Sequence, residues 1–409
     1  MNAGSHRDLV VINLAAFLRS LGVGLMGVVL GIYLSRIGFS AFRIGAVVAI
    51  GLAGSAVATT VVGFAADRIG RKHFLIILSI LTVLGGLALY AAPKLPLLLA
   101  MAFVAMLNGT GTERSAMFAL EQAMIPGLGP DTRRTWNLAF YNVLIDGGSS
   151  LGALSAALPV FLQQRFSLSL LGGYRILFLG FSALYIATAI LYSLLSSAVE
   201  VNNLPALERA GRAASESKKV IVKLAALFSL DAFGGGFLTD ALVSYWFFRR
   251  FGLSEHDLGL VFFAVHVLNA ISHLGAAWLA RRIGLVNTMV FTHLPSSLFL
   301  IAVPFAPSAK WAVVLFFARE ALVEMDVPTR QSYVASVVSP RERSFASAVT
   351  NLARNVWWAI GSAAAGLLMQ VVSFSAPLFV GGSAKIFYDL LLYRSFRALK
   401  PPEETHSSL

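Results

Sequence analysis

The sequence predicts an all-α membrane protein with twelve transmembrane helices in two pseudo-symmetric six-helix bundles. Composition is the first reason: 57% of the 409 residues are hydrophobic, 13% are charged, and the mean hydropathy is +0.76. Soluble domains are far less apolar. The second reason is that apolar runs of about twenty residues recur along the chain, each long enough to cross a hydrocarbon core of ~30 Å as a helix. The third is an internal repeat, because the two halves of the chain align.

Apolar runs follow one another along the whole chain, separated by charged residues or by breaks that contain proline or glycine. The runs are continuously apolar rather than alternating, which favours helices over a β-barrel, because lipid offers no partner to an unpaired backbone group. The expected spans, in order, cover approximately residues 9–33, 43–66, 74–92, 96–120, 137–163, 174–196, 220–248, 257–280, 286–306, 311–333, 344–372 and 375–394.

Basic residues concentrate in the loops on one side of the predicted bundle. With an even number of spans both termini share that side, so the positive-inside rule predicts that both are cytoplasmic and that the protein is integral to the cytoplasmic (inner) membrane. The net charge of +12 follows from these loops, which meet anionic lipid, and does not indicate nucleic-acid binding. The absence of cysteine excludes disulfides and thiolate metal sites.

The two halves match at a nearly constant offset. Arg36-Ile-Gly-Phe-Ser40 recurs as Arg250-Phe-Gly-Leu-Ser254, 214 residues later, and spans four and five recur as spans ten and eleven at an offset of 209. Two six-span halves in the same orientation are related by an axis along the membrane normal. The expected organisation is an N-terminal bundle at 1–198, a cytoplasmic linker at 199–219, a C-terminal bundle at 220–396 and a cytoplasmic tail at 397–409.

The loop after the second span is the most specific motif of the chain. It reads Gly63-Phe-Ala-Ala-Asp67-Arg68-Ile-Gly70-Arg71-Lys72. With its six plus six spans and a charged central loop, the chain resembles the major facilitator superfamily over nearly its whole length. The resemblance implies transport by alternating access, no enzymatic activity and no cofactor. It also implies that this loop latches one face of the bundle and opens during turnover; the alternative is a loop that only sets topology and folding.

The residue types of this loop suit a latch. Gly63 would permit close helix approach, Gly70 would permit a tight turn, and Asp67 would accept a basic side chain or a helix N-terminus.

Ionisable residues inside the spans are the candidates for substrate and coupling sites, because a charge in the bilayer is costly unless it is paired or hydrated. In the superfamily that this chain resembles, the first, fourth, seventh and tenth spans line the cavity, and here they carry most of these residues. The substrate and coupling candidates are Arg19, Asp231, Asp146 and Asp240, with Tyr141 and Trp357 as aromatic residues deep in the bundle. The gate candidates, besides the loop, are Glu113, Arg114, Glu121, Glu324, Asp326 and Arg330.

Arg19 and Asp231 are equivalent in the repeat, 212 residues apart, and each lies near mid-depth before a Gly-rich turn. One hypothesis is that they pair across the axis, so that substrate or a proton competes for one partner. The alternative is that each is neutralised within its own half, for example by pairing of Arg19 with Asp146. Asp146 is itself a second candidate for proton coupling, although the glycines beside it are typical of a helix-packing face.

The sequence favours a bacterial-type, proton-coupled exporter of a drug or metabolite. The expected partners are a small-molecule substrate, protons and membrane lipid, and the expected state is a monomer. Span five lacks the proline that drug-proton antiporters carry after Gly152, which weakens the drug assignment. Uptake of a small organic solute is the first alternative. A non-transporting sensor or scaffold is the second, and the many buried charges argue against it. His266 and His273 lack carboxylate company in span eight and are not expected to bind metal.

Overall fold

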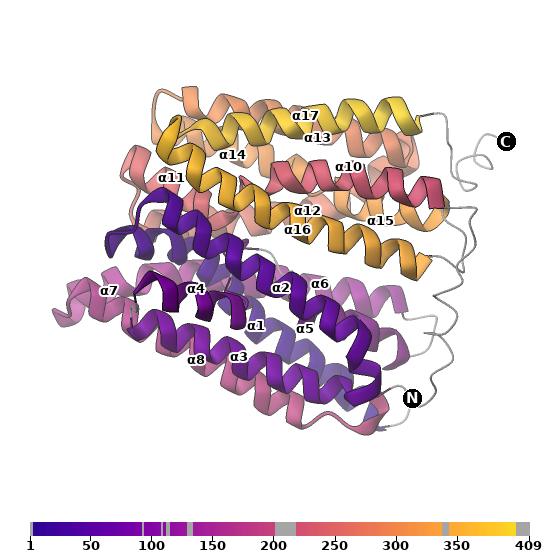
Figure 1. Cartoon of the computed structure of the whole chain (residues 1–409), viewed down its shortest axis with the longest axis horizontal. Coiled ribbons are helices and arrows are strands. Elements are labelled where there is room, and N and C mark those ends of the chain that lie inside the picture. The colour runs from indigo at the N-terminus through magenta and orange to yellow at the C-terminus, as the bar shows by residue number, and fades with distance from the viewer. Residues whose placement is uncertain are drawn as a thin grey trace. The chain divides into compact units, whose positions relative to one another are not determined.

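The computed structural model describes residues 3–91, 94–107, 109–111, 115–128, 134–200, 218–337 and 343–397, and the regular elements in these ranges are helices (Figure 1). Eight helical segments of this described part are long and apolar enough to cross a membrane. The remaining spans are shorter or more polar helices, and four of the twelve spans consist of two helices in succession. The all-helical prediction is therefore confirmed.

The first six spans occupy the N-terminal half of the chain. They are α1 (Ala3–Arg36), α2 (Ala41–Ile69), α3 (Arg71–Ala91), α4 (Leu95–Val104) with α5 (Ala116–Met124), α6 (Arg134–Leu154) with α7 (Leu158–Phe166), and α8 (Leu170–Ser193). Short 3₁₀ turns follow α5 (Ile125–Leu128), join α6 to α7 (Ser155–Ala157) and follow α8 (Ser197–Val199).

The last six spans follow the same order. They are α10 (Lys218–Gly236) with α11 (Asp240–Phe251), α12 (Glu255–Ile283), α13 (Leu285–Ala302), α14 (Ala309–Val323) with α15 (Asp326–Val337), α16 (Arg343–Val371) and α17 (Ala376–Phe396). A 3₁₀ turn, Val303–Phe305, follows α13.

Spans four, seven and ten are broken, which corrects the expectation of single helices over 96–120, 220–248 and 311–333. The seventh span stops at Gly236 and resumes at Asp240, with Thr239 in the extended region. Three consecutive glycines, 234–236, precede this break and weaken the helix there. In the fourth span, Met106 and Gly111 have positive φ angles of 53° and 71°, which no helix interior accommodates. Discontinuous helices of this kind are where transporters place binding sites.

The chain divides into two compact units. Unit 1 is Met1–Leu204 with Thr239–His266, and unit 2 is Pro205–Leu238 with Val267–Leu409. In unit 1, α11 packs against α1, and the hydroxyl of Ser244 donates to the carbonyl of Val28 over 3.0 Å. The chain passes from unit 2 to unit 1 inside the break of the seventh span. The expected linker at 199–219 lies almost wholly outside the described residues, and the expected bundle boundaries stay predictions.

A close contact between a glycine and a neighbouring helix occurs at equivalent positions in both units. A Cβ on Gly24 of α1 would lie 2.0 Å from the carbonyl oxygen of Ser149 in α6. A Cβ on Gly236 of α10 would lie 2.3 Å from the carbonyl oxygen of Trp358 in α16. The glycines are 212 residues apart and their partners 209, so the same contact occurs in both halves of the repeat. Small residues allow this approach of backbones where lipid provides no hydrophobic drive.

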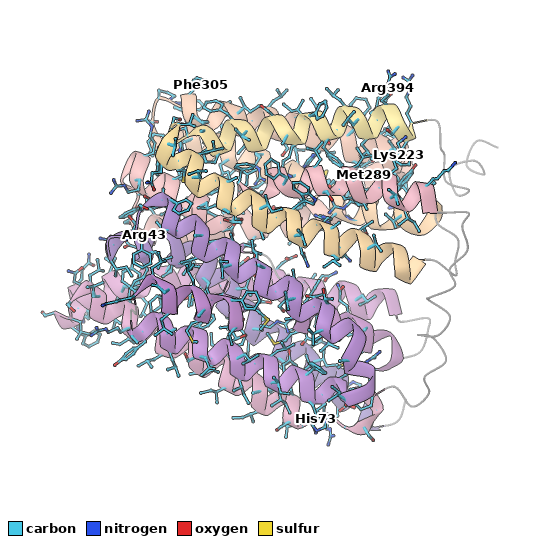
Figure 2. The ribbon with its side chains drawn as sticks, viewed as in Figure 1. Arg43, His73, Lys223, Met289, Phe305 and Arg394 are labelled. Carbon is cyan, nitrogen blue, oxygen red and sulfur yellow. The ribbon has the colours of Figure 1, made fainter. Side chains whose placement is uncertain are left out.

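The outer surface of the bundle is apolar. Phe305 is 74% exposed, whereas Met289 lies in the buried core of unit 2 (Figure 2). Many other large apolar side chains are exposed along α3, α8, α12 and α17. Exposed apolar surface on this scale marks contact with a membrane, as expected of a multi-pass integral membrane protein.

Gly24→Ala is expected to lower the free energy of unfolding by about 1–3 kcal/mol, because the added methyl group meets a backbone oxygen that cannot move without separating two helices. The measurement is the thermal unfolding of the purified protein in detergent. Gly63→Ala is the matched control, since no described heavy atom lies within 4 Å of its Cβ position. Equal melting temperatures for Gly24→Ala and Gly63→Ala would contradict the packing account. The close helix approach expected at Gly63 stays a prediction.

Candidate functional site

A buried cluster in unit 1 surrounds Arg19 and is called the Arg19 cluster (Arg19, Glu121, Tyr141 and Tyr192). The guanidinium of Arg19 lies 2.7 Å from Glu121 Oε2 and donates to the hydroxyl of Tyr192 over 2.8 Å. The hydroxyls of Tyr141 and Tyr192 donate to the two oxygens of Glu121 over 2.6 and 2.7 Å. All four residues are fully buried. Both carboxylate oxygens therefore have charged or polar donors, and the ion pair is satisfied inside the bundle.

The Arg19 cluster revises two expectations. Arg19 is neutralised by Glu121 within its own unit, which is the alternative to a pair with Asp231, and a contact with Asp146 stays a prediction. Glu121, expected in a gate, and Tyr141, expected to line a cavity, are both packed against Arg19.

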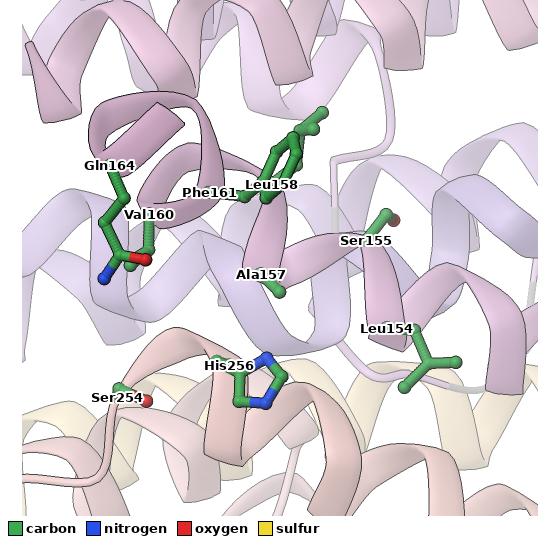
Figure 3. A pocket seen from close by; sticks show the side chains of 9 residues that line it. All are labelled: Leu154, Ser155, Ala157, Leu158, Val160, Phe161, Gln164, Ser254 and His256. Atoms are coloured by element: carbon green, nitrogen blue, oxygen red, sulfur yellow. The ribbon is translucent and has the colours of Figure 1, made fainter. Parts of the chain in front are cut away.

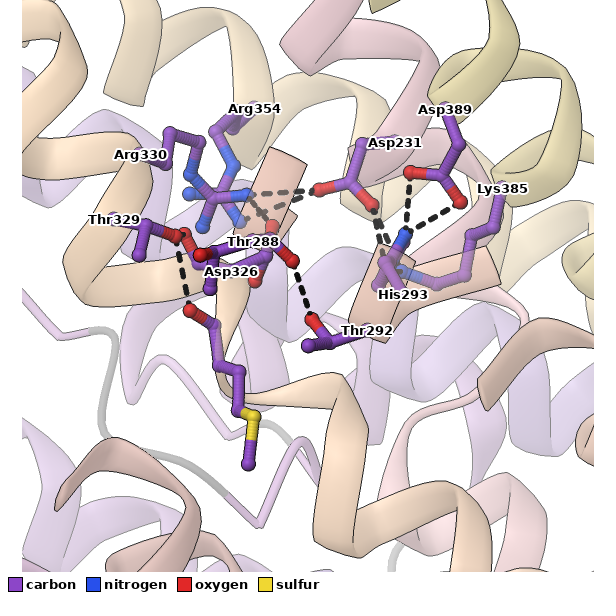
Figure 4. A network of polar contacts seen from close by, with 11 residues as sticks. Asp231, Thr288, Thr292, His293, Asp326, Thr329, Arg330, Arg354, Lys385 and Asp389 are labelled. Carbon is purple, nitrogen blue, oxygen red and sulfur yellow. Dashed lines mark hydrogen bonds and ion pairs between the residues drawn. The ribbon is translucent and has the colours of Figure 1, made fainter. Parts of the chain in front are cut away.

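A larger group of ionisable side chains lies inside unit 2 and is called the Asp231 network (Figure 4). Asp231 of α10 accepts hydrogen bonds from Lys385 over 2.8 Å and from Arg330 over 3.2 Å, and Arg354 lies 3.8 Å away. Arg330 also pairs with Asp326, one turn earlier in α15, at 2.7 Å. The members of the Asp231 network are Asp231, His293, Asp326, Arg330, Arg354, Lys385 and Asp389, which belong to α10, α13, α15, α16 and α17.

The Asp231 network ends in a histidine and a second carboxylate. His293 Nδ1 lies 2.9 and 3.1 Å from the two oxygens of Asp389, and His293 Nε2 lies 3.3 Å from Lys385 Nζ. Asp389 is fully buried and His293 is 1% exposed. With three carboxylates against three arginine or lysine side chains, the network is electrically balanced when the imidazole is neutral. Burial of so many charges is tolerated only because they neutralise one another.

The two clusters are charge-reversed copies of one arrangement. Arg19 corresponds to Asp231 at an offset of 212, and Glu121 corresponds to Arg330 at an offset of 209. Each half thus joins its first span to its fourth by a buried ion pair, with the basic residue on the first span in unit 1 and on the fourth span in unit 2. The offsets are visible in the sequence, but the pairing required the structure.

A third group of polar residues in unit 1 surrounds the start of α11. Asp240 is the first residue of that helix, and its Oδ2 lies 3.6 Å from Nε2 of His266 in α12. Gly27 and Gly111 make room for it, because a Cβ on Gly27 would lie 3.2 Å from Asp240 Oδ2 and one on Gly111 would overlap the carboxylate. His266 thus has a carboxylate close by, which its sequence context did not indicate.

An ion pair in unit 1 joins the end of α1 to the start of α12. Arg36, at the end of α1, lies 2.6 Å from Glu255 at the start of α12, and the hydroxyl of Tyr174 in α8 donates to the same carboxylate over 2.6 Å. Neither Glu255 nor Tyr174 was expected as a functional residue. Side chains from α1 and α8 therefore bind the same buried carboxylate of α12.

The signature loop contains a helix start that is held by a distant carboxylate. Gly70 has φ 118°, as a tight turn requires, so that expectation is confirmed. The backbone N–H groups of Arg71 and Lys72 donate to the two oxygens of Glu200 over 2.7 and 3.1 Å, and Lys72 Nζ donates to the carbonyl of Leu195 over 2.8 Å. A carboxylate at a helix N-terminus is stabilised by the free N–H groups and the helix dipole. Glu200, which the sequence did not single out, therefore ties the loop to the chain that follows α8.

The remaining predicted site residues lie elsewhere or are not described. Asp146 is half-buried on α6, and Glu324 is half-buried at the end of α14. Trp357 is 43% exposed, and its ring meets the edge of Phe233 at 5.9 Å. The calls that lie outside the described part are the side chains of Asp67 and Arg68 and the residues Glu113 and Arg114.

A cavity of about 750 Å³ lies in unit 1 between α6–α7 and the start of α12 (Figure 3). Its walls are largely apolar, and the polar side chains that line it are Ser155, Gln164, Ser254 and His256. It shares no residue with the Arg19 cluster or with Asp240 and His266. Two of its lining residues, Ser254 and His256, flank the buried Glu255.

Broken helices with ionisable residues buried at their centres define the class of this protein as a membrane transporter. The model of the Major Facilitator Superfamily matches residues 12–362 and 224–408, and the chain belongs to this superfamily. The resemblance drawn from the signature loop is thus confirmed, and the protein is not an enzyme.

Relatives agree with this assignment. A membrane protein of Saccharomyces cerevisiae described as uncharacterised is 26% identical over 419 residues, which cover 95% of this chain and 94% of the relative. The crystal structure of a D-xylose-proton symporter matches with a TM-score of 0.73 and 15% identity over 95% of this chain and 98% of its own. The structure of the nucleoside transporter NupG matches with a TM-score of 0.74 and 13% identity over 95% and 99%. At these identities the structural matches show the fold alone.

Arg19→Gln is expected to lower the free energy of unfolding by about 3–5 kcal/mol, because it leaves the buried Glu121 carboxylate without its charged partner. Adding Glu121→Gln removes that uncompensated charge, so the double variant is expected to lose less than the sum of the two single changes, by about 0.5–3 kcal/mol. Unfolding in mixed detergent micelles measures the four proteins of this cycle. Lys310→Gln at an exposed position is the control. Strictly additive losses would show that the pair contributes nothing.

Proposed function

We propose that this protein is a proton-coupled secondary transporter that exports a small drug-like or metabolite molecule by alternating access. The observation that carries the proposal is the Asp231 network, which places seven ionisable side chains inside the membrane-spanning part of unit 2. Ionisable residues at this depth are costly and mark ion, proton or substrate pathways in membrane proteins.

The Asp231 contacts fit a coupling role. Asp231 shares its two oxygens between Lys385 and Arg330, which belong to different helices, α17 and α15. Movement of one helix away from α10 would leave a buried charge without a partner, at a cost of about 3–5 kcal/mol. A proton or a substrate that replaces the lost partner offsets this cost. Movement of the helices is thereby linked to the presence of that ligand.

The Arg19 cluster has a different role in this proposal. Its ion pair is closed by two tyrosine hydroxyls and has a carboxylate whose oxygens are both occupied. Such a fully satisfied pair suits a fixed joint between the first, fourth, fifth and sixth spans. We therefore assign coupling to unit 2 and assign Arg19, Glu121 and Tyr141 to the structural support of unit 1.

The substrate and the gates are assigned to other parts of the fold. Asp240 lies at the break of the seventh span, where transporters place substrate-binding groups, and is proposed to contact the substrate. The loop from Gly63 to Lys72, held by Glu200, is proposed as the cytoplasmic latch.

Direction, location and assembly rest on the sequence. Export is kept as the first candidate although span five has only the glycines of the drug-proton antiporter pattern, Gly148 and Gly152, and lacks its proline. The excess of basic residues in the loops of one side favours cytoplasmic termini in the cytoplasmic membrane. Members of the superfamily generally act as monomers, and the same is proposed here. Proton-driven uptake is the second candidate, and the structural likeness to a D-xylose-proton symporter favours it.

The measurement uses proteoliposomes that contain the wild-type protein and a pH-sensitive dye, to which the members of a library of drugs and metabolites are added one at a time. We expect proton movement whenever the added compound is transported. Asp231→Asn is expected to reduce this proton movement at least about tenfold, because the amide no longer attracts Lys385 and Arg330 as the carboxylate does. Asp257→Asn, an exposed change at the start of α12, is the matched control. The direction of the proton movement relative to the compound separates export from uptake. Compound flux without proton movement, or an unchanged Asp231→Asn, would overturn the proposal.

A further inference from the structure

His293 lies between Asp389 and Lys385 in the Asp231 network, and these two neighbours favour one tautomer of its ring. An ionised Asp389 can only accept, so Nδ1 then carries the hydrogen of the contact between them. A charged Lys385 can only donate, so Nε2 then accepts in the 3.3 Å contact with Nζ. In the tautomer that satisfies both contacts the imidazole is neutral, and the free electron pair of Nε2 faces Lys385.

Lys385 Nζ bridges this electron pair and Asp231. It donates to Asp231 Oδ1 over 2.8 Å and to His293 Nε2 over 3.3 Å. His293 Nε2 itself lies 3.8 Å from the same oxygen of Asp231. Two groups thus stand beside one carboxylate oxygen, and only one of them can donate to it while the imidazole is neutral (Figure 4).

We propose that His293 Nε2 is a proton-binding site and that the proton bound there replaces Lys385 as the donor to Asp231. When Nε2 takes up one proton, its electron pair forms the new N–H bond and the ring becomes an imidazolium. It can then no longer accept from Lys385, and two positively charged nitrogens stand 3.3 Å apart. This repulsion releases Lys385, and the new N–H then donates to Asp231 Oδ1, which lies 3.8 Å from Nε2. Asp389 balances the imidazolium charge through Nδ1.

The groups that act on His293 come from every helix packed around it. On α17 these are Lys385, Tyr388 and Asp389, on α10 Asp231, on α15 Asp326 and Arg330, and on α16 Arg354, which reaches it through Asp231. Helix α14, which also packs against α13, carries Arg319 and Glu320, and these two pair with each other. The nearest partners are two carboxylates and one ammonium. Proton binding is thus favoured by Asp231 and Asp389 and opposed by Lys385.

This inference deepens the proposed function and rests on it for the use of the proton, since release of Lys385 from Asp231 is the event that would free α17 from α10. The existence of the site does not depend on a known substrate. It is therefore tested without one.

The test is nitrogen NMR of the full chain in lipid nanodiscs, with ¹⁵N-labelled histidine, between pH 9 and pH 5. The chain has seven histidines, and His293→Gln identifies the signals of His293 by their loss. His266→Gln, a second buried histidine, is the control and leaves those signals in place. We expect a neutral ring with hydrogen on Nδ1 at high pH that converts to the imidazolium as the pH falls. A ring that stays in one form over the whole range would overturn the proposal.

Two variants separate proton binding from a merely structural contact. Asp389→Asn is expected to bind the proton at least about tenfold more weakly, because the balancing carboxylate is lost, and Lys385→Gln at least about tenfold more tightly, because the opposing ammonium is lost. Equal midpoints in the wild type and either folded variant would contradict the proposed site. Proton flux measured on the same preparation separates the proposed proton site from the proposed function. Titration of His293 without compound-linked proton flux would support the site and contradict the function. Compound-linked flux without titration of His293 would support the function and contradict the site.

Discussion

A buried carboxylate must be neutralised, and much of unit 2 is arranged to meet this requirement at Asp231. Asp231 is 3% exposed and lies in the C-terminal half of α10, where no other residue is charged. Its oxygens are reached by side chains from α15, α16 and α17, and α13 adds the histidine beside them. Removing one member of such a group leaves another charge uncompensated, so these helices are held together by their charges as well as by packing. A rearrangement of the helices therefore has to exchange partners rather than abandon them.

The repeat shows which part of this arrangement is common to both halves. An ion pair between the first and fourth spans occurs in each unit, and only its polarity differs. The attraction between two opposite charges is unchanged when they are exchanged, so duplicated halves can diverge in polarity while retaining the contact. What differs is the surroundings. Tyrosine hydroxyls complete the pair in unit 1, whereas in unit 2 a lysine, a histidine and two further carboxylates extend it. The Asp231 network in unit 2 can therefore distribute its protons and hydrogen-bond donors in several ways, whereas the Arg19 cluster in unit 1 has one arrangement.

The sequence was sufficient for the fold and for some of the residues at its centre. Apolar runs and the signature loop predicted a twelve-span transporter, and the offset of 212 predicted that Arg19 and Asp231 are equivalent. The sequence indicated a Gly-rich turn in the seventh span but not that the helix is divided there. The breaks in the fourth and tenth spans were missed, because the average hydropathy of a window does not register the backbone conformation of single residues. Both Arg19 and Glu121 were singled out from the sequence, but their pairing was missed. Whether two residues on spans one and four lie close together depends on the tertiary structure.

His293, Lys385 and Asp389 were missed for another reason. The candidates came from the spans that line the cavity in the superfamily, whereas these three residues lie in the ninth and twelfth spans. A signal was present, since Lys385 and Asp389 are four residues apart and therefore on one face of an otherwise apolar helix. Glu200 gave no such signal, because its role depends on the fold bringing the end of the sixth span to the start of α3.

The central claim is that a proton and Lys385 compete for Asp231. The most direct measurement is the coupling free energy between these two residues, from unfolding of the wild type, Asp231→Asn, Lys385→Met and the double variant, at pH 8 and at pH 5. We expect a coupling of about 1–3 kcal/mol at pH 8 that falls substantially at pH 5, where the imidazolium of His293 has replaced the ammonium. A coupling of the same size at both pH values would contradict it.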